Sequence, residues 1–76
     1  MSSPIVIPQF GLVEEVIVLE WLKAEGDQVS AGEPIVLLET EKTQTEVEAL
    51  DDGILRIAVP AGPDPIAPDT VLGYIE

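Results

Sequence analysis

The stretch PIVLLETEKTQTEVEA, residues 34–49, predicts two antiparallel strands joined by a tight turn. Its second half alternates two sets of side chains, with the period of two that is typical of a half-buried strand. One face carries Thr45, Val47 and Ala49, and the other carries Gln44, Glu46 and Glu48. If 34–40 and 43–49 are consecutive strands, Glu41 and Lys42 form the turn of a hairpin. Because the turn lacks Asn-Gly or Asp-Gly, we expect a loop based on a type I turn.

The rest of the chain has the punctuation of an all-β protein. Proline and glycine recur at short intervals, and the apolar runs between them are four to eight residues long, which suits strands better than helices. The segment Glu14 to Glu25 is the one rival for a helix, but its β-branched content and consecutive apolar residues favour a strand. We expect strands at 4–8, 15–23, 28–30, 34–40, 43–49, 53–59, 65–67 and 71–76.

An internal repeat organises these strands into two halves. Residues 26–39 lie over residues 63–76 at a shift of 37 positions, with two identities in fourteen. Upstream the shift is 42 and pairs Ile5 with Val47 and Gly11 with Gly53, so the first half carries five extra residues, most simply 12–16. The repeat predicts two four-stranded antiparallel sheets that face each other across one core with pseudo-twofold symmetry.

Size and composition limit the function. A chain of 76 residues forms one small domain, expected here to span 1–76 and to be a monomer. It has no cysteine and no histidine, which excludes disulfides, thiolate metal sites and a histidine base, and we expect no metal site. The net charge of -12 disfavours nucleic acid and membrane surfaces and favours basic protein partners. With no signal-like or membrane-spanning segment, we expect a cytoplasmic protein or an excised domain.

Lys42 is the residue whose position needs an explanation. A nucleophilic lysine needs a desolvated or cation-flanked setting, whereas this one stands among Glu39, Glu41 and Glu46. The simplest interpretation is a solubilising charge that pairs weakly with Glu41 or Glu39. The alternative is that a hairpin tip presents Lys42 as the substrate of a modifying enzyme. An independent enzyme has no support, because the chain lacks histidine, cysteine and a phosphate-binding loop.

Four segments resemble the lipoyl domains of 2-oxo acid dehydrogenase complexes, within the biotinyl/lipoyl carrier family. They are IPQFG at 7–11, VLEWLKAEGDQVSAGEPI at 18–35, ETEKT at 39–43, which is similar to the modification motif ETDKA, and EVEALDDGIL at 46–55. The resemblance implies a flattened barrel-sandwich with amide-linked lipoate on Lys42 at a hairpin tip. It also implies four kinds of partner: a lipoate-protein ligase or lipoyl transferase, a thiamin-diphosphate 2-oxo acid decarboxylase, an acyltransferase core and dihydrolipoamide dehydrogenase.

The resemblance further implies which residues a partner inspects. The loop that begins at Gln9 and ends at Glu15 would help the decarboxylase choose its carrier, and Glu39, Gly26 and Gly53 would matter for lipoate attachment. The chemistry of glycine itself favours a turn role for Gly26 and Gly53. The residues expected to serve recognition are Glu39, Thr40, Glu41, Thr43, Phe10, Gly11, Leu12 and Val13.

The sequence departs from the family pattern at three positions, and two other functions of the same fold remain as alternatives. Glu41 replaces the usual Asp, Val16 stands where glycine is common, and Leu50 replaces a frequent proline. A biotin carrier shares the fold, but its lysine usually sits between methionines, and the only methionine here is Met1. An unmodified adaptor domain of the same fold is the other alternative.

Overall fold

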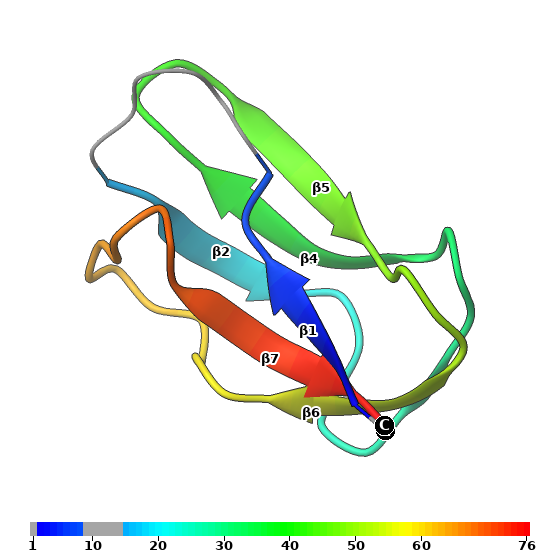
Figure 1. Ribbon diagram of the computed structural model, residues 1–76. Helices are drawn as coiled ribbons and strands as arrows, with labels where there is room; N and C mark the ends of the chain where they lie inside the picture. The colour runs from blue at the N-terminus through cyan, green and yellow to red at the C-terminus, as the bar shows by residue number, and fades with distance from the viewer. Residues whose placement is uncertain (1, 9–14) are drawn as a thin grey trace.

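The computed structural model describes residues 2–8 and 15–76, and in them the chain is all-β, as predicted. The described residues form seven strands, most of them labelled in Figure 1, and no helix, so the helical alternative for residues 14–25 is wrong for its described part, 15–25. The strands are β1 (Ser3–Val6), β2 (Ile17–Trp21), β3 (Gln28–Val29), β4 (Pro34–Glu39), β5 (Gln44–Glu48), β6 (Gly53–Ile57) and β7 (Val71–Ile75). No helix in this part of the chain is long and apolar enough to cross a membrane.

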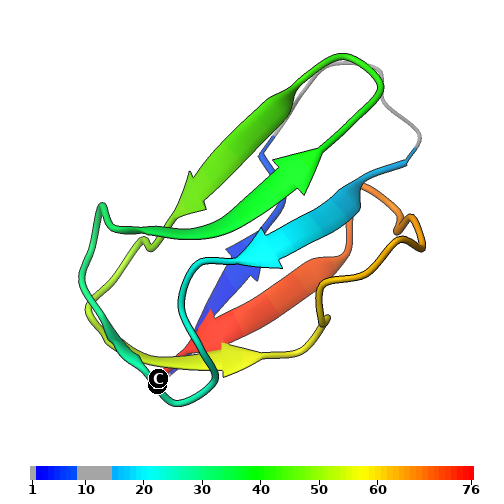
Figure 2. The same ribbon diagram turned by 180° about the vertical axis from the view of Figure 1, so that it is seen from behind.

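The strands form two antiparallel sheets, whose layers can be followed in Figures 1 and 2. One has four strands in the order β1-β7-β6-β3, and the other has three in the order β2-β4-β5. The predicted sandwich is therefore confirmed, but the prediction of two four-stranded sheets is wrong by one strand in the described residues.

The missing eighth strand is reduced to a single bridge at Ile66. Its N–H donates to the Val16 carbonyl at 2.8 Å, and the Val16 N–H donates back at 3.0 Å. Pro63, Pro65 and Pro68 surround this bridge. A proline has no N–H, so the segment predicted as strand 65–67 cannot extend the ladder beyond Ile66.

The pairing repeats between the two halves residue by residue. The register of β1 on β7 reproduces that of β5 on β4 at the shifts of 42 and 37 that the sequence predicts. Ser3–Ile75 matches Thr45–Leu38, Pro4–Tyr74 matches Glu46–Leu37, and Ile5–Gly73 matches Val47–Val36. Both ladders then shift register at the next step, to Val6–Val71 and Glu48–Pro34. The pseudo-twofold symmetry is thus a property of the backbone pairing, although the sequence identity between the halves is slight.

The extra residues of the first half lie between β1 and β2. The bridge between Val16 and Ile66 in one half matches the pair Gly53 and Val29 in the other, with both residues moved by 37 positions. The shift is therefore already 37 at Val16, whereas it is 42 in β1. Val16, rather than Gly11, therefore occupies the place of Gly53, and Val16 itself is not one of the inserted residues. Residues 12–14 of the predicted insertion are outside the described part.

The core is built from branched aliphatic side chains. Val47 and Ala49 of the alternating stretch are buried, whereas Gln44, Glu46 and Glu48 are exposed, as their alternation predicts. Each buried valine, leucine or isoleucine contributes about 1.5–3 kcal/mol. The buried set comprises Ile5, Ile7, Val16, Val18, Val29, Ile35, Val36, Leu38, Val47, Ala49, Leu55, Leu72 and Ile75.

Candidate functional site at the hairpin between strands 4 and 5

The loop that carries Lys42 is closed by the side chain of Thr40. The Thr40 N–H donates to the Thr43 carbonyl at 2.8 Å, which continues the ladder of β4 and β5 one step beyond Glu39–Gln44. The Thr40 Oγ1 accepts from the N–H groups of Lys42 and Thr43, both at 3.2 Å, and donates to the Thr43 carbonyl at 3.3 Å. Thr40 is 8% exposed. Its hydroxyl therefore organises the backbone on both sides of the loop from a buried position.

The backbone of the loop uses no left-handed residue. No non-glycine residue in ranges 2–8 and 15–76 has a positive φ, so Glu41 and Lys42 do not form the type I′ turn that needs positive φ at both. This result confirms that the hairpin avoids a primed turn, as the lack of Asn-Gly or Asp-Gly predicts. The chain turns with ordinary residues because Thr40 bonds two amides that the turn leaves unpaired.

Lys42 differs from the other two basic residues of the chain. Lys23 pairs with Glu33 at 3.1 Å, and Arg56 pairs with Glu25 at 3.1 Å and with Glu76 at 2.8 Å. Lys42 is exposed, and within the described residues no carboxylate lies within 4.0 Å of its amine. The expected weak pairing with Glu39 or Glu41 is thus absent, and the hairpin presents the amine to solvent.

A depression of about 290 Å³ lies beside this loop. It brings together the predicted recognition residues Glu39, Thr40 and Glu41 with Ile17, the first residue of β2, and Glu15, which precedes that strand. Glu15 ends the loop that the family resemblance implicates, but Ile17 was not predicted. The signal that marks Ile17 is its pairing with Glu39, which places an apolar side chain in line with the end of β4.

The remaining predicted recognition residues do not line the depression or lie outside the described residues. Thr43 is exposed in the loop, where its hydroxyl donates to the Gln44 carbonyl at 3.1 Å, and it does not line the depression. Phe10, Gly11, Leu12 and Val13 lie outside the described residues. Their recognition role stays a prediction.

Both predicted turn glycines have a structural reason. Gly26 has a φ of 86°, as the third residue of a turn in which the Asp27 N–H donates to the Ala24 carbonyl at 3.0 Å. This positive φ favours glycine. At Gly53 the reason is close approach: an added Cβ would lie 2.8 Å from the Ile75 Cγ2 and would overlap the Glu76 carbonyl oxygen.

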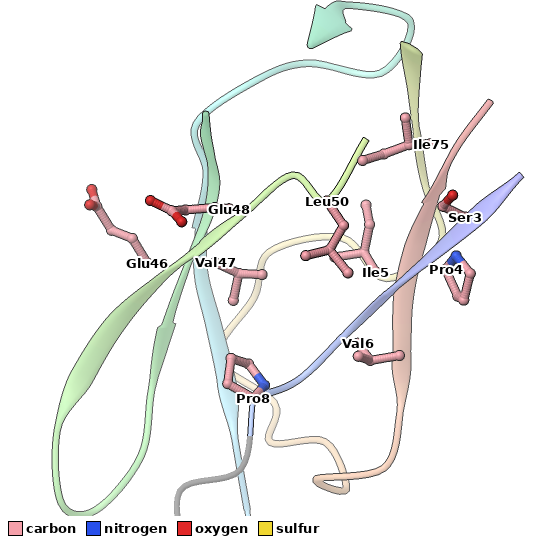
Figure 3. A pocket seen from close by; sticks show the side chains of 10 residues that line it. All are labelled: Ser3, Pro4, Ile5, Val6, Pro8, Glu46, Val47, Glu48, Leu50 and Ile75. Carbon is pink, nitrogen blue, oxygen red and sulfur yellow. The ribbon is translucent and has the colours of Figure 1, made fainter. Parts of the chain in front are cut away.

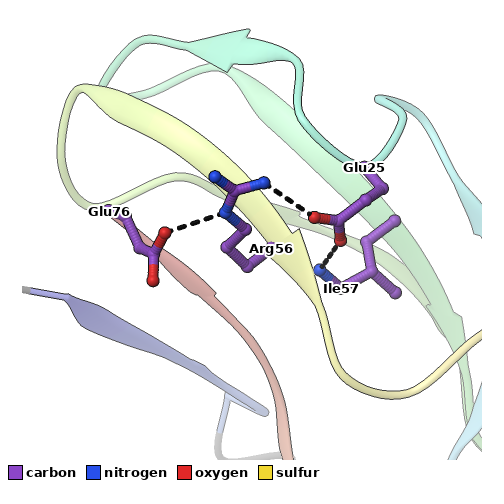
Figure 4. A network of polar contacts seen from close by, with 4 residues as sticks. All are labelled: Glu25, Arg56, Ile57 and Glu76. Carbon is purple, nitrogen blue, oxygen red and sulfur yellow. Dashed lines mark hydrogen bonds and ion pairs between the residues drawn. The ribbon is translucent and has the colours of Figure 1, made fainter.

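A polar network at the other end of the molecule ties the turn at Gly26 to β6 and the last residue, as Figure 4 shows. Glu25 accepts from the Ile57 N–H at 2.6 Å and from Arg56 at 3.1 Å, and Arg56 also donates to Glu76 at 2.8 Å. The hydrogen bond from Ile57, followed by that from Arg56, lowers the pKa of the Glu25 carboxyl. Glu76 and then Glu25 raise the pKa of Arg56. The network holds this basic residue in a structural role.

The carboxylates of the described residues do not assemble into a metal site. Within the described ranges, no group of three or more aspartate or glutamate side chains is placed to hold a metal ion. At the loop between β4 and β5, the group available for chemistry is the exposed primary amine of Lys42, which stands beside acidic side chains.

Comparison with known proteins agrees with this geometry. A family model described as "Biotin-requiring enzyme", of the biotin/lipoyl type, matches residues 3–75. The acetyltransferase component of the acetoin cleaving system of Cupriavidus necator is 40% identical over 73 residues, which cover 95% of this chain and 20% of that protein.

Two proteins of Rhizobium meliloti are each 38% identical over 64 residues, 83% of this chain and 14% of theirs. They are the dihydrolipoyllysine-residue acetyltransferase component of the pyruvate dehydrogenase complex and the beta subunit of pyruvate dehydrogenase E1. The chain spans a fifth or less of the length of these relatives. The chain belongs to the biotinyl/lipoyl carrier family, and it is a lipoyl domain.

Proposed function

We propose that Lys42 carries an amide-linked lipoyl group and that the domain moves acyl groups and reducing equivalents between the active sites of a 2-oxo acid dehydrogenase complex. The observation that carries this proposal is the position of Lys42, exposed at the tip of a hairpin and outside every ion pair in the described part of the chain. The family match and the names of the relatives support lipoate as the cofactor.

The hairpin fits an amide-linked arm for two reasons. First, the turn is held by hydrogen bonds from the backbone N–H groups of Lys42 and Thr43 to Thr40, and the Lys42 amine takes part in no ion pair of the described residues. Second, the loop projects from two paired strands whose inner side chains, such as Leu38 and Val47, are in the core. An enzyme can therefore engage the tip without disturbing the fold.

When bound, lipoate supplies a dithiolane that accepts an acyl group and two electrons. The protein contributes a rigid base, a tether and a surface that partners recognise. A tethered carrier meets each active site at an effective concentration in the millimolar range, so transfer between sites avoids free diffusion of an intermediate.

The partners we propose follow from this role. A lipoate-protein ligase or lipoyl transferase forms the amide on Lys42. A thiamin-diphosphate decarboxylase, an acyltransferase core and dihydrolipoamide dehydrogenase then use the arm. The named relatives belong to pyruvate dehydrogenase and acetoin cleaving systems, which supports partners of this class. A net charge of -12 favours partners with basic surfaces and opposes self-association.

The test is intact-mass measurement after incubation with lipoate, ATP and a lipoate-protein ligase. We expect the unaltered chain to gain one lipoyl group and the Lys42→Arg variant to gain none, while Lys23→Arg, the matched control, still gains one. A parallel incubation with biotin and a biotin ligase tests the rival cofactor. A gain of biotin without a gain of lipoate would assign the chain to the biotin carriers, and no gain in either incubation would favour the adaptor.

A further inference from the structure

A second surface lies away from the Lys42 loop, in an apolar groove of about 300 Å³ between β1 and β5. These are edge strands of the two different sheets, and each has one paired neighbour. Figure 3 shows Ile5, Val47 and Leu50 directed into the space between them. Lys42 and its neighbours in the loop are not among the lining residues.

The groove leaves large apolar side chains in solvent. Leu50 is 72% exposed and Val6 is 50% exposed, and both line the groove. They are two of the four most exposed large hydrophobic residues in the described part of the chain. Exposed edge strands also carry unpaired backbone N–H and C=O groups, which favour pairing with another extended segment.

The rim of the groove carries only negative charge among the described residues. Glu46 and Glu48 also line the groove, and Figure 3 shows their side chains on the opposite side of β5 from Val47, directed away from the space that Val47 enters. Asp51 adds a third carboxylate, which accepts a hydrogen bond from the hydroxyl of the lining residue Ser3. No described lysine or arginine lines the groove. An occupant must therefore combine apolar side chains with positive charge.

We propose that this groove docks an extended segment of a partner protein in which apolar side chains alternate with lysine or arginine. The period of two in an extended chain lets apolar side chains enter between Val47, Leu50 and Ile5 while basic ones reach Glu46 and Glu48. A second copy of this chain fits poorly, because its net charge is -12. The proposal does not depend on lipoate, since no part of the Lys42 loop lines the groove.

The length of the occupant follows from the strands. The five residues of β5 span roughly 17 Å at 3.3–3.4 Å per residue, so a segment of about five to seven residues covers the edge. A contact of this size is small, and we expect weak, rapidly exchanging binding.

The experiment titrates the isotope-labelled chain with an end-blocked heptapeptide of alternating lysine and valine and follows backbone amide shifts by NMR. We expect shifts in β1, β5 and residues 49–51. Leu50→Ser should weaken binding roughly tenfold, because it removes an exposed leucine that the peptide covers. Leu22→Ser is the matched control, since Leu22 is 37% exposed but does not line the groove.

Charge is tested separately. The double variant Glu46→Gln and Glu48→Gln should weaken binding severalfold at low salt and less at high salt. The matched control is Glu20→Gln, whose carboxylate lies outside the groove. A peptide of alternating glutamate and valine should leave the amide shifts unchanged.

Four results with the peptides and variants would overturn the proposal, and a fifth, with the chain alone, would do so as well. The four are shifts confined to residues 40–43, equal binding of a lysine and serine peptide that lacks apolar side chains, equal weakening by Leu50→Ser and Leu22→Ser, and no shift at millimolar peptide. Shifts of the same groove residues that depend on the concentration of the chain alone would identify a second copy as the occupant, and would overturn it too.

Discussion

Replacing Thr40 with valine tests whether its hydroxyl organises the hairpin tip. Valine keeps the β-branched shape of this 8% exposed side chain but removes the oxygen that accepts from the Lys42 and Thr43 N–H groups and donates to the Thr43 carbonyl. The ladder bond from the Thr40 N–H to the Thr43 carbonyl at 2.8 Å remains. The substitution therefore isolates the side-chain contribution.

The cost can be worked from these three bonds. Their lengths of 3.2, 3.2 and 3.3 Å are at or beyond the long end of the usual range, so each contributes toward the lower part of the net 0.5–1.5 kcal/mol. Water reaches part of an exposed loop and offsets some of the loss. We expect Thr40→Val to lower the free energy of unfolding by about 1–2 kcal/mol, which in a domain of this size lowers Tm by roughly 4–16 °C.

The assay is urea unfolding followed by the fluorescence of Trp21, the only tryptophan, whose Nε1 donates to the Val59 carbonyl at 2.8 Å. Hydrogen exchange of the Lys42 and Thr43 amides should also become faster. Thr43→Val is the matched control, because its hydroxyl makes one exposed bond to its neighbour and should cost less than about 0.5 kcal/mol. A Thr40→Val variant as stable as the unaltered chain, or a Thr43→Val variant that loses as much, would refute the reasoning.

Three further predictions concern the glycine at β6, the acidic network and the loop surface. Gly53→Ala should lower the free energy of unfolding, measured in urea, by about 1–3 kcal/mol, because the new Cβ would lie 2.8 Å from the Ile75 Cγ2. The control is Gly62→Ala, whose Cβ would meet nothing within 4 Å and which should cost less than about 0.5 kcal/mol. Equal costs would contradict the close approach at Gly53. Folding lowers the pKa of Glu25 from an ordinary 4.5, so its contribution to stability is present above that value and is lost as the pH falls through the lowered pKa. Glu25→Gln should therefore destabilise the chain at pH 7, and the difference should shrink as the pH is lowered below 4.5; a constant difference would count against the network. Glu41 lines the depression beside Lys42, so Glu41→Gln should reduce kcat/KM for lipoylation severalfold, whereas the control Glu20→Gln should leave it unchanged. An unaltered kcat/KM in Glu41→Gln would show that the ligase does not recognise Glu41.

Much of the fold was predictable because local patterns and tertiary packing agree. The alternation at residues 43–49 follows from one buried and one exposed face, and the shifts of 37 and 42 follow from two halves that pair in the same register. One error, besides the placing of Val16 in the insertion, lies at residues 65–67, where Ile66 has the apolar character of a strand residue but flanking prolines leave it with one bridge. Periodicity records which side chains are apolar, whereas ladder length depends on available N–H groups.

The candidate site was predictable in its centre and less so at its border. The turn position of Lys42 follows from the lengths of the two strands around it. That Thr40 is buried, and that Ile17 joins the depression, depends on how β2 and β4 are placed side by side, which no local pattern encodes. The groove between β1 and β5 was not predictable for the same reason, because its walls come from opposite sheets.

The central claim, that the tip lysine is the attachment site, is tested most directly by tryptic mapping of the chain after incubation with a lipoate-protein ligase. Trypsin has three cleavage positions here, after Lys23, Lys42 and Arg56. Lipoylation of Lys42 blocks the middle one, so we predict a single fragment of residues 24–56 that carries the mass of one lipoyl group. Cleavage after Lys42 would contradict the account, whether it gives an unmodified fragment 24–42 or, with lipoate on Lys23, a lipoylated fragment 1–42.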